Sequence, residues 1–185
     1  MKTIIYDNLL NEVECNFLID FYKNNEKYAE KFRDIYPLIL KKGELEFLEN
    51  KLLTISKEFN AKIDYFQIVK WPIGSYQKLH FDDTYSSILS SITYLNDNFE
   101  GGQTYFEDGT TFKPKKGRGL FFNGQYHKHG VSKVVNNIRY VVATWYKKEA
   151  WQINNFLVGY TLWHMRGKKE WLLTTNGKVG KTIIL

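Results

Sequence analysis

The stretch Lys78-Leu79-His80-Phe81-Asp82 lies in a run of short apolar and β-branched segments that extends from Lys62 to Lys147. Turn residues such as Gly101-Gly102 separate the segments, and the alternation within them indicates strands. The predicted strands are residues 63–71, 77–82, 87–95, 103–106, 110–113, 118–123, 127–133 and 138–147. About eight short strands are typical of a double-stranded β-helix, or jelly roll, whose open end can hold a metal.

Two segments with helical periodicity precede these strands. Apolar residues recur at near-helical spacing in residues 9–25 and again in 43–60, after a short predicted strand at 2–6. Residues 28–40 have no clear period and include Pro37, so we expect an irregular loop near the site there. Helices followed by a run of strands predict an α+β fold in which the helices brace one face of the β core.

Residues 149–185 form an aromatic and β-branched extension in which Asn176-Gly177 is a tight-turn signal. We expect this extension to add strands to the sheet or to cover one of its edges. A homodimer contact or a substrate arm is the alternative. The predicted organisation is a single domain with an N-terminal strand and helices (1–62), a jelly-roll catalytic core (63–148) and the β-rich extension.

Composition and charge narrow the classes of partner. Of the 185 residues, 43% are hydrophobic and 17% aromatic, which excludes a disordered chain. The formal net charge is +6, but residues 150–185 carry five basic side chains against Glu170, a balance of +4, so the first 149 residues carry +2. A basic tail on a near-neutral body disfavours nucleic acid as the partner.

The sequence also bears on the compartment. Cys15 is the only cysteine, so no intramolecular disulfide can form. Residues 1–8 contain no apolar signal region, and no window approaches the roughly 18 apolar residues that cross a bilayer. We therefore expect a cytoplasmic protein with no membrane partner, in a reducing compartment that keeps iron ferrous.

His80 and Asp82 share one face of their predicted strand, because successive side chains of a strand alternate. His129 comes from a distant predicted strand, and Arg139 follows it ten residues later. Two histidines and one carboxylate can occupy one face of an octahedral metal and leave three positions open, as in non-haem Fe(II) sites. An arginine offers a two-pronged donor for a carboxylate. Together these residues predict a site for Fe(II) and a 2-oxo acid.

Five blocks of residues surround these candidates in a fixed order. They are Trp71-Pro72-Ile73-Gly74-Ser75-Tyr76, Ile92-Thr93-Tyr94-Leu95-Asn96-Asp97, Phe99-Glu100-Gly101-Gly102-Gln103-Thr104, Lys113-Pro114-Lys115-Lys116-Gly117-Arg118-Gly119-Leu120-Phe121-Phe122, and His129-Gly130-Val131 through Arg139-Tyr140-Val141-Val142. From about Tyr65 to Tyr146 the chain thereby resembles the prolyl 4-hydroxylase-like branch of the 2-oxoglutarate/Fe(II)-dependent dioxygenases.

The resemblance implies a catalytic set of four residues. His80, Asp82 and His129 would bind Fe(II), and Arg139 would pair with the distal carboxylate of the cosubstrate 2-oxoglutarate. A dicarboxylate needs a cation at the far end of its pocket while its keto acid chelates the metal, so this position of the arginine makes chemical sense.

Four aromatic residues in the matching blocks complete the predicted pocket. Tyr94 matches a tyrosine whose hydroxyl helps to hold the distal carboxylate, and Tyr76 lies in the block that forms the other wall of the cosubstrate site. Trp145 matches an aromatic residue near the substrate entrance, and Trp71 stands where relatives often have tyrosine, so both are predicted to contact substrate. Core packing is the alternative for Tyr94 and Trp145.

Two neighbouring residues compete with the predicted metal ligands. Asp83 is the competing carboxylate, and strand alternation turns it away from the face of His80. His127 is the competing histidine and shares a strand face with His129. We favour His129 because the family carries its basic residue about ten positions past the ligand, as Arg139 is here.

The activity implied by the resemblance is hydroxylation of an unactivated C–H bond by O2, coupled to conversion of 2-oxoglutarate into succinate and CO2, with ascorbate as a reductant. The leading substrate is a proline in a peptide or protein. Free proline or another small molecule is the alternative, and a nucleic-acid demethylase is less favoured because it needs a basic, aromatic-lined groove. A non-catalytic β-barrel binding module would predict a broken triad or a missing arginine, and the sequence has neither defect.

Overall fold

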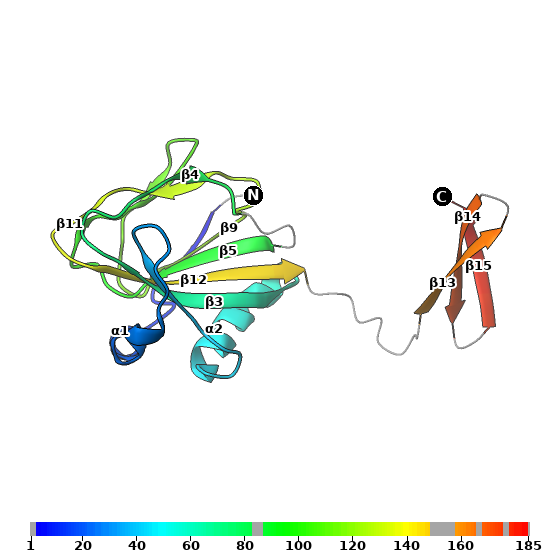
Figure 1. Cartoon of the computed structure of the whole chain (residues 1–185), viewed down its shortest axis with the longest axis horizontal. Coiled ribbons are helices and arrows are strands. Elements are labelled where there is room, and N and C mark those ends of the chain that lie inside the picture. The colour runs from blue at the N-terminus through cyan, green and yellow to red at the C-terminus, as the bar shows by residue number, and fades with distance from the viewer. Residues whose placement is uncertain (1–2, 83–86, 149–157, 166–167, 176–177, 185) are drawn as a thin grey trace. The chain divides into compact units, whose positions relative to one another are not determined.

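The computed structural model describes residues 3–82, 87–148, 158–165, 168–175 and 178–184. The chain divides into two compact units, Met1–Glu149 and Ala150–Leu185, and each is described by itself (Figure 1). For the second unit the description covers the backbone. The boundary between the units lies where the sequence predicts the catalytic core to end.

The first unit is built on a six-stranded antiparallel sheet. Its strands, in spatial order, are β1 (Ile4–Tyr6), β9 (Gly119–Phe122), β5 (Ser87–Tyr94), β12 (Arg139–Lys148), β3 (Ala61–Trp71) and β2 (Tyr36–Ile39). The longest strands, β3 and β12, lie side by side at the centre and pair over nearly their whole length. This pairing fixes which side chains of the two strands share a face.

A smaller sheet forms the second layer. Its strands, in spatial order, are β4 (Gln77–His80), β10 (His129–Val131), β7 (Thr104–Phe106) and β8 (Thr111–Phe112), and a separate two-stranded ribbon joins β11 (Val134–Val135) to β6 (Glu100–Gly101). Figure 1 shows β4 and β11 on one side of the larger sheet and the helices on the other. The α+β jelly-roll fold predicted from the sequence is confirmed.

Two helices cover the outer face of the larger sheet. Helix α1 (Glu12–Asn25) begins at Asn11, whose side chain accepts from the backbone N–H of Glu14 while Glu14 bonds back to Asn11. This capping box satisfies two backbone donors at the start of the helix. Helix α2 (Glu46–Ser56) runs into a short 3-10 helix, η2 (Lys57–Phe59), and another 3-10 helix, η1 (Glu26–Tyr28), follows α1.

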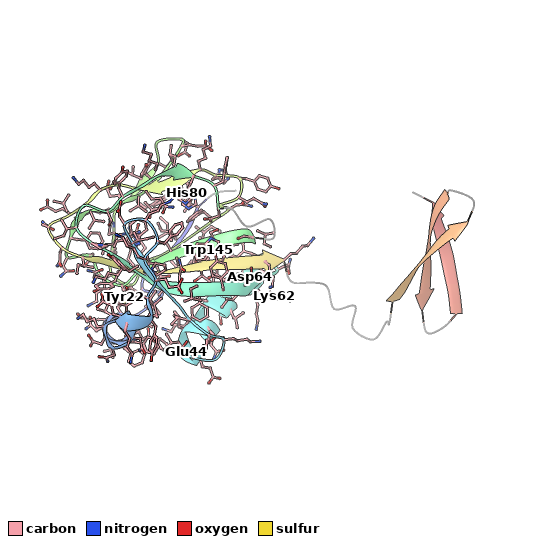
Figure 2. The ribbon with its side chains drawn as sticks, in the orientation of Figure 1. Tyr22, Glu44, Lys62, Asp64, His80 and Trp145 are labelled. Carbon is pink, nitrogen blue, oxygen red and sulfur yellow. The ribbon has the colours of Figure 1, made fainter. Side chains whose placement is uncertain are left out.

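The larger sheet has a distinct apolar cluster on each face. On the helix side, buried residues of the helices such as Leu18, Tyr22 and Leu52 pack in one cluster with Phe121 and Tyr146 of the strands. On the opposite side lies a second cluster, made of Val69, Trp71, Tyr94, Phe106, Leu120, Phe122, Val131, Val134, Val141 and Ala143. The helices therefore cover one face of the larger sheet and leave the other face for the predicted site. Figure 2 shows Tyr22 on the helix side and His80 on the opposite side.

The expectation of an irregular loop at residues 28–40 is wrong. Phe32 and Ile35 exchange two backbone hydrogen bonds of 2.9 and 3.1 Å around a two-residue turn, and β2 then pairs with β3. Pro37 is tolerated within β2 because this strand lies at the edge of the sheet, where a missing N–H breaks no ladder. The segment is thus a hairpin that extends the larger sheet.

The second unit is a three-stranded antiparallel sheet of β13 (Val158–Met165), β14 (Lys168–Thr175) and β15 (Lys178–Ile184). These strands pair with one another, and the expectation that the extension adds strands to the core sheet or covers one of its edges stays a prediction. Strands that follow one another closely along the chain pair locally more readily than they join a distant edge. The predicted turn at Asn176-Gly177 lies outside the described residues. Within the described residues no helix has the length and apolar character needed to span a bilayer.

We expect the fragment 1–149 to fold without the rest of the chain, because every strand of its two main sheets has its hydrogen-bonded neighbours inside that fragment. Its free energy of unfolding should differ from that of the full chain by less than about 1 kcal/mol, or roughly 2–4 °C in melting temperature. Thermal unfolding followed by circular dichroism checks this.

The fragment 1–135 is the matched control. It ends before β12, so β3 and β5 lose their common neighbour, and it should not fold. Aggregation of the 1–149 fragment under conditions in which the full chain remains in solution would contradict the expectation.

Candidate active site

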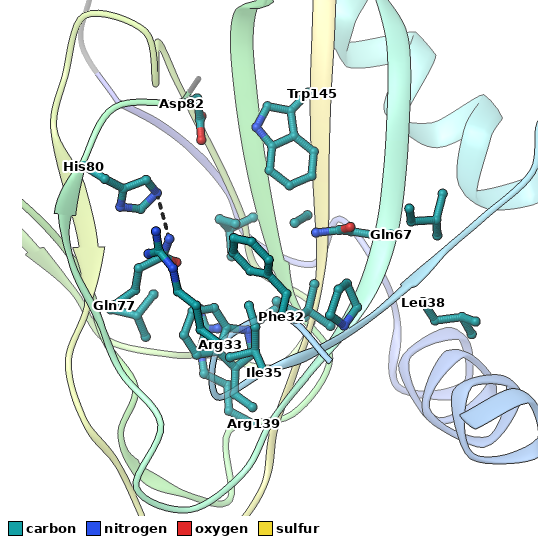
Figure 3. Close-up of a pocket in the computed structure, with 18 of the residues that line it drawn as sticks. Phe32, Arg33, Ile35, Leu38, Gln67, Gln77, His80, Asp82, Arg139 and Trp145 are labelled. Carbon is teal, nitrogen blue, oxygen red and sulfur yellow. Dashed lines mark hydrogen bonds between the residues drawn. The ribbon is translucent and has the colours of Figure 1, made fainter. Parts of the chain in front are cut away.

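A cavity of about 790 Å³ opens on the face of the larger sheet that the helices leave uncovered (Figure 3). Its walls come from β3, β12 and β5 of the larger sheet, from β4 and β10 of the smaller sheet, and from the hairpin around Phe32 and Ile35. His80, Asp82, His129 and Arg139 all line it. The jelly roll thus collects into one space the four residues that the sequence predicts to be catalytic.

The three predicted iron ligands lie together. His129 is the direct cross-strand partner of His80, and the centroids of their rings are 4.4 Å apart. Asp82 Oδ1 is 3.7 Å from Nε2 of His129. One ligand atom from each of the three side chains lies within 4.8 Å of the others. Two imidazoles and a carboxylate this close can hold one divalent metal ion from one side.

Backbone carbonyls orient both imidazole rings. Nδ1 of His80 lies 3.0 Å from the carbonyl of Lys78, and Nδ1 of His129 lies 3.2 Å from the carbonyl of His127. Both contacts favour the tautomer with the proton on Nδ1, which leaves the Nε2 lone pair for a metal. At His80 that lone pair meets the side-chain amide of Gln77 at 3.2 Å, shown as the dashed line in Figure 3.

Burial lowers the pKa of His129, and the charge of Asp82 opposes this effect. Burial lowers this pKa because an imidazolium in an apolar surrounding is poorly solvated. A neutral imidazole is the form that binds a metal. The environment of His129 therefore prepares it for that role.

The competing histidine is placed differently. His127 is half-buried, contributes its backbone carbonyl to the orientation of His129, and does not belong to the cluster of ligand atoms. The competing carboxylate, Asp83, lies outside the described residues. Among the described residues, the geometry groups His129 with His80 and Asp82.

Arg139 is fully buried at the start of β12, and within the described part of the chain none of its three guanidinium nitrogens has a hydrogen-bond partner. Its Cζ atom lies over the rings of Trp71 and Tyr94, 4.8 and 5.3 Å from their centroids. Burial lowers the pKa of Arg139, and Tyr94 raises it. A buried, unpaired charge is costly, so the position calls for an anion. The distal carboxylate of 2-oxoglutarate fits this requirement.

Gly102 lets Arg139 lie where it does. A Cβ atom on Gly102 would come within 3.0 Å of Cδ of Arg139 and 2.7 Å of the ring of Phe99. Its φ of +57° also lies in the left-handed region that favours glycine. The Gly101-Gly102 pair therefore serves the pocket as well as the turn.

Trp71 belongs to the cosubstrate end of the cavity. It is the cross-strand partner of Arg139, and its buried indole N–H has no hydrogen-bond partner among the residues that the structure describes. An orphaned donor beside an orphaned guanidinium suits a carboxylate rather than an apolar substrate. The predicted contact of Trp71 with substrate stays a prediction, and its place beside Arg139 favours the cosubstrate.

Tyr94 and Tyr76 differ in position. Tyr94 is fully buried, and its hydroxyl is 2.7 Å from Oγ1 of Thr104, a residue that lines the cavity. Tyr76 is 51% exposed and does not line the cavity, because the next residue, Gln77, turns inward in its place. The expectation that Tyr76 binds the cosubstrate stays a prediction that this exposed position does not support. The sequence analysis singles out neither Gln77, which contacts His80 three residues on, nor Thr104, which contacts Tyr94 ten residues back.

Trp145 lies at the other end of the cavity. Its ring stacks on that of Tyr65, with centroids 4.6 Å apart and planes 13° apart. Burial raises the pKa of Tyr65 to about 12, so its hydroxyl remains protonated. Figure 3 shows Trp145 near Asp82 and far from Arg139 along the strands. The predicted contact of Trp145 with substrate is compatible with this place and stays a prediction.

Replacement of His129 by alanine should reduce Fe(II) binding below detection, because two ligands remain where three are needed. His127→Ala should bind Fe(II) as the unchanged protein does. Anaerobic titration with Fe(II) measures both, and circular dichroism shows that each variant is folded. Loss of binding in His127→Ala with retention in His129→Ala would reverse the assignment.

Arg139→Met keeps the volume of the side chain and removes its charge. It should weaken 2-oxoglutarate binding by roughly 10- to 150-fold, the equivalent of the about 1.5–3 kcal/mol of a hydrogen bond to a charged group. Calorimetry on the Mn(II)-loaded protein measures this binding without turnover. Tyr94→Phe, the milder control, should act in the same direction with a smaller effect. Unchanged binding in Arg139→Met would remove the residue from the cosubstrate site.

Comparison with known proteins agrees with this geometry. Residues 54–147 match the 2OG-Fe(II) oxygenase superfamily. The chain is 22% identical to a putative prolyl 4-hydroxylase of Acanthamoeba polyphaga mimivirus over 180 residues, which cover 80% of this chain and 74% of that protein.

Two solved structures share the fold. A viral collagen prolyl hydroxylase from Paramecium Bursaria Chlorella virus-1, in complex with 2-oxoglutarate, superposes with a TM-score of 0.67 at 22% identity, covering 80% of this chain and 96% of that one. A prolyl hydroxylase from Trichoplax adhaerens, in complex with a hypoxia inducible factor peptide fragment, gives 0.67 at 17% identity, with 80% and 84% covered. The chain belongs to the 2OG-Fe(II) oxygenase superfamily and is a dioxygenase that uses Fe(II), 2-oxoglutarate and O2; the relatives that it resembles here are prolyl hydroxylases.

Proposed function

We propose that this dioxygenase hydroxylates a proline residue within a peptide or protein. In the balanced reaction, one atom of O2 enters the C–H bond of the substrate as a hydroxyl group, and the other enters succinate, formed from 2-oxoglutarate with loss of CO2. The bound Fe(II) supplies the activation of O2 that no side chain can provide. The residues of the chain hold, orient and shield the reactants.

The observation that carries the proposal is the composition of the cavity rim. Tyr28, Phe32, Ile39 and Phe81 line the cavity and are nevertheless 64, 52, 64 and 45% exposed. Large apolar side chains that border a cavity and face solvent mark a surface for a partner. A free amino acid would be enclosed by the cavity, whereas a polypeptide also needs support outside it.

The hairpin supplies most of this rim and a charged residue at its tip. Arg33 has a φ of +55°, an uncommon conformation for a residue with a side chain. Figure 3 shows its side chain directed into the cavity, towards His80 and Gln77. Backbone strain of this kind is retained where the surrounding structure uses it, which supports a role of the hairpin in holding substrate.

The two ends of the cavity would bind different molecules. At one end Arg139 and Trp71 offer donors for the distal carboxylate of the cosubstrate. A cosubstrate held there would direct its keto acid towards the cluster of His80, Asp82 and His129. At the other end Trp145 and Tyr65 present a flat aromatic wall. A pyrrolidine ring packs well on such a wall, and its target C–H bond would lie beside the ligands. A cavity of about 790 Å³ leaves room for both molecules.

The test is product analysis by mass spectrometry. The protein is incubated with Fe(II), 2-oxoglutarate and air, together with proline-containing peptides of varied flanking sequence or with free proline. We expect a peptide product heavier by one oxygen atom, located on proline by fragmentation, with one succinate formed for each hydroxylation. Conversion of free proline without any peptide product would contradict the proposal.

Phe32→Ala is the matched rim variant. It should raise the KM for the peptide while leaving the 2-oxoglutarate requirement unchanged, since Phe32 belongs to the exposed rim and not to the Arg139 end. His129→Ala serves as the inactive control.

A further inference from the structure

Asp82 is held by two contacts besides any metal. Its carboxylate atom Oδ2 accepts a hydrogen bond of 2.5 Å from Oγ of Ser90 on β5, and its backbone N–H donates to the carbonyl of Gly124 at 2.9 Å. The strand β4 ends at His80, so the ladder of the smaller sheet does not hold Asp82. The hydroxyl of Ser90 and the carbonyl of Gly124 hold Asp82 in place of the hydrogen bonds of the ladder.

Gly124 presses against the same carboxylate. A Cβ atom at this position would lie 1.9 Å from Oδ2 of Asp82 and 2.8 Å from Oγ of Ser90. Glycine is required here for space, since any side chain would displace the carboxylate from the hydroxyl. Asp82 is thus confined between the backbone after β9 and the side chain of Ser90.

This confinement distinguishes the two carboxylate oxygens. Oδ2 is occupied by Ser90, while Oδ1 is the oxygen that lies 3.7 Å from Nε2 of His129. A hydrogen bond from a hydroxyl to a carboxylate is of the charge-assisted, stronger kind. One oxygen is therefore directed to the metal and the other is kept away from it.

We propose that Ser90 is a positioning residue for the iron centre: its hydroxyl, with the bare backbone of Gly124, fixes Asp82 as a one-oxygen ligand and thereby keeps a coordination position open for cosubstrate and O2. The inference rests on the assignment of His80, Asp82 and His129 as ligands and is independent of the substrate. Partners behind a metal ligand commonly change metal affinity by about 10- to 100-fold when they are removed.

The next residue on the strand offers a matched control. Ser91 is as buried as Ser90, with exposures of 1 and 4%. Strand alternation turns it to the helix side, where its Oγ lies 2.9 Å from the hydroxyl of Tyr146. Replacement of either serine by alanine removes the same atom and one buried hydrogen bond. Only the replacement of Ser90 should change the affinity for the metal.

The experiment is anaerobic titration of the full chain with Fe(II), and separately with Co(II), without cosubstrate. We expect Ser90→Ala to bind Fe(II) about 10- to 100-fold more weakly and Ser91→Ala to bind as the unchanged protein does. The visible absorption of bound Co(II) should change in Ser90→Ala, because a released carboxylate alters the coordination number. Ser90→Thr restores the hydroxyl and should recover most of the affinity.

Fe(II) affinity of Ser90→Ala within twofold of the unchanged protein, with the same Co(II) spectrum, would overturn the proposal. Equal losses in Ser90→Ala and Ser91→Ala would also overturn it, because they would report packing alone. If Ser90→Ala does not fold, Ser90→Cys keeps the shape with a weak donor, and the same thresholds apply. Undiminished Fe(II) binding by His129→Ala would instead refute the ligand assignment.

Discussion

Arg139 places a full positive charge inside the first unit, and no described residue forms a hydrogen bond with any of its three guanidinium nitrogens. The protein tolerates this cost because β12, which carries the residue, pairs along its length with β3 on one side and β5 on the other. Apolar residues on both faces of the sheet supply the compensating burial. A bound dicarboxylate would remove the cost, so binding and stability are linked.

The candidate metal ligands lie across the cavity from Arg139, with His80 and His129 on the smaller sheet and Asp82 just beyond the end of β4. The pairing of β10 with β4 brings His129 opposite His80, while the pairing of β12 with β3 brings Arg139 opposite Trp71. The jelly roll therefore fixes the separation between the ligand cluster and the cationic end of the pocket through two registers, each set by backbone hydrogen bonds. A cosubstrate with one chelating end and one carboxylate end spans this gap, and the aromatic wall of Tyr65 and Trp145 remains for substrate.

The sequence predicts the jelly-roll core, both helices and the grouping of His80, Asp82 and His129, because alternation and block order are local signals. Strand alternation alone does not explain the position of Asp82, because the strand ends at His80. Contacts with Ser90 and Gly124 hold Asp82 instead. Those contacts join residues 8 and 42 positions away from Asp82, a relation that spacing does not encode. Spacing also does not predict that β2 is a strand or that the last three strands pair with one another. Both features depend on which strand edge is free to pair in the folded chain.

We infer that one cavity holds Fe(II) and 2-oxoglutarate together, with the 2-oxo acid chelating the metal. A 2-oxo acid that chelates Fe(II) gives a visible charge-transfer absorption, which can be followed without turnover when O2 is excluded. We expect this absorption to appear when 2-oxoglutarate is added to the Fe(II)-loaded protein, and with neither component alone. Fe(II)-loaded protein that binds 2-oxoglutarate without developing the absorption would contradict it.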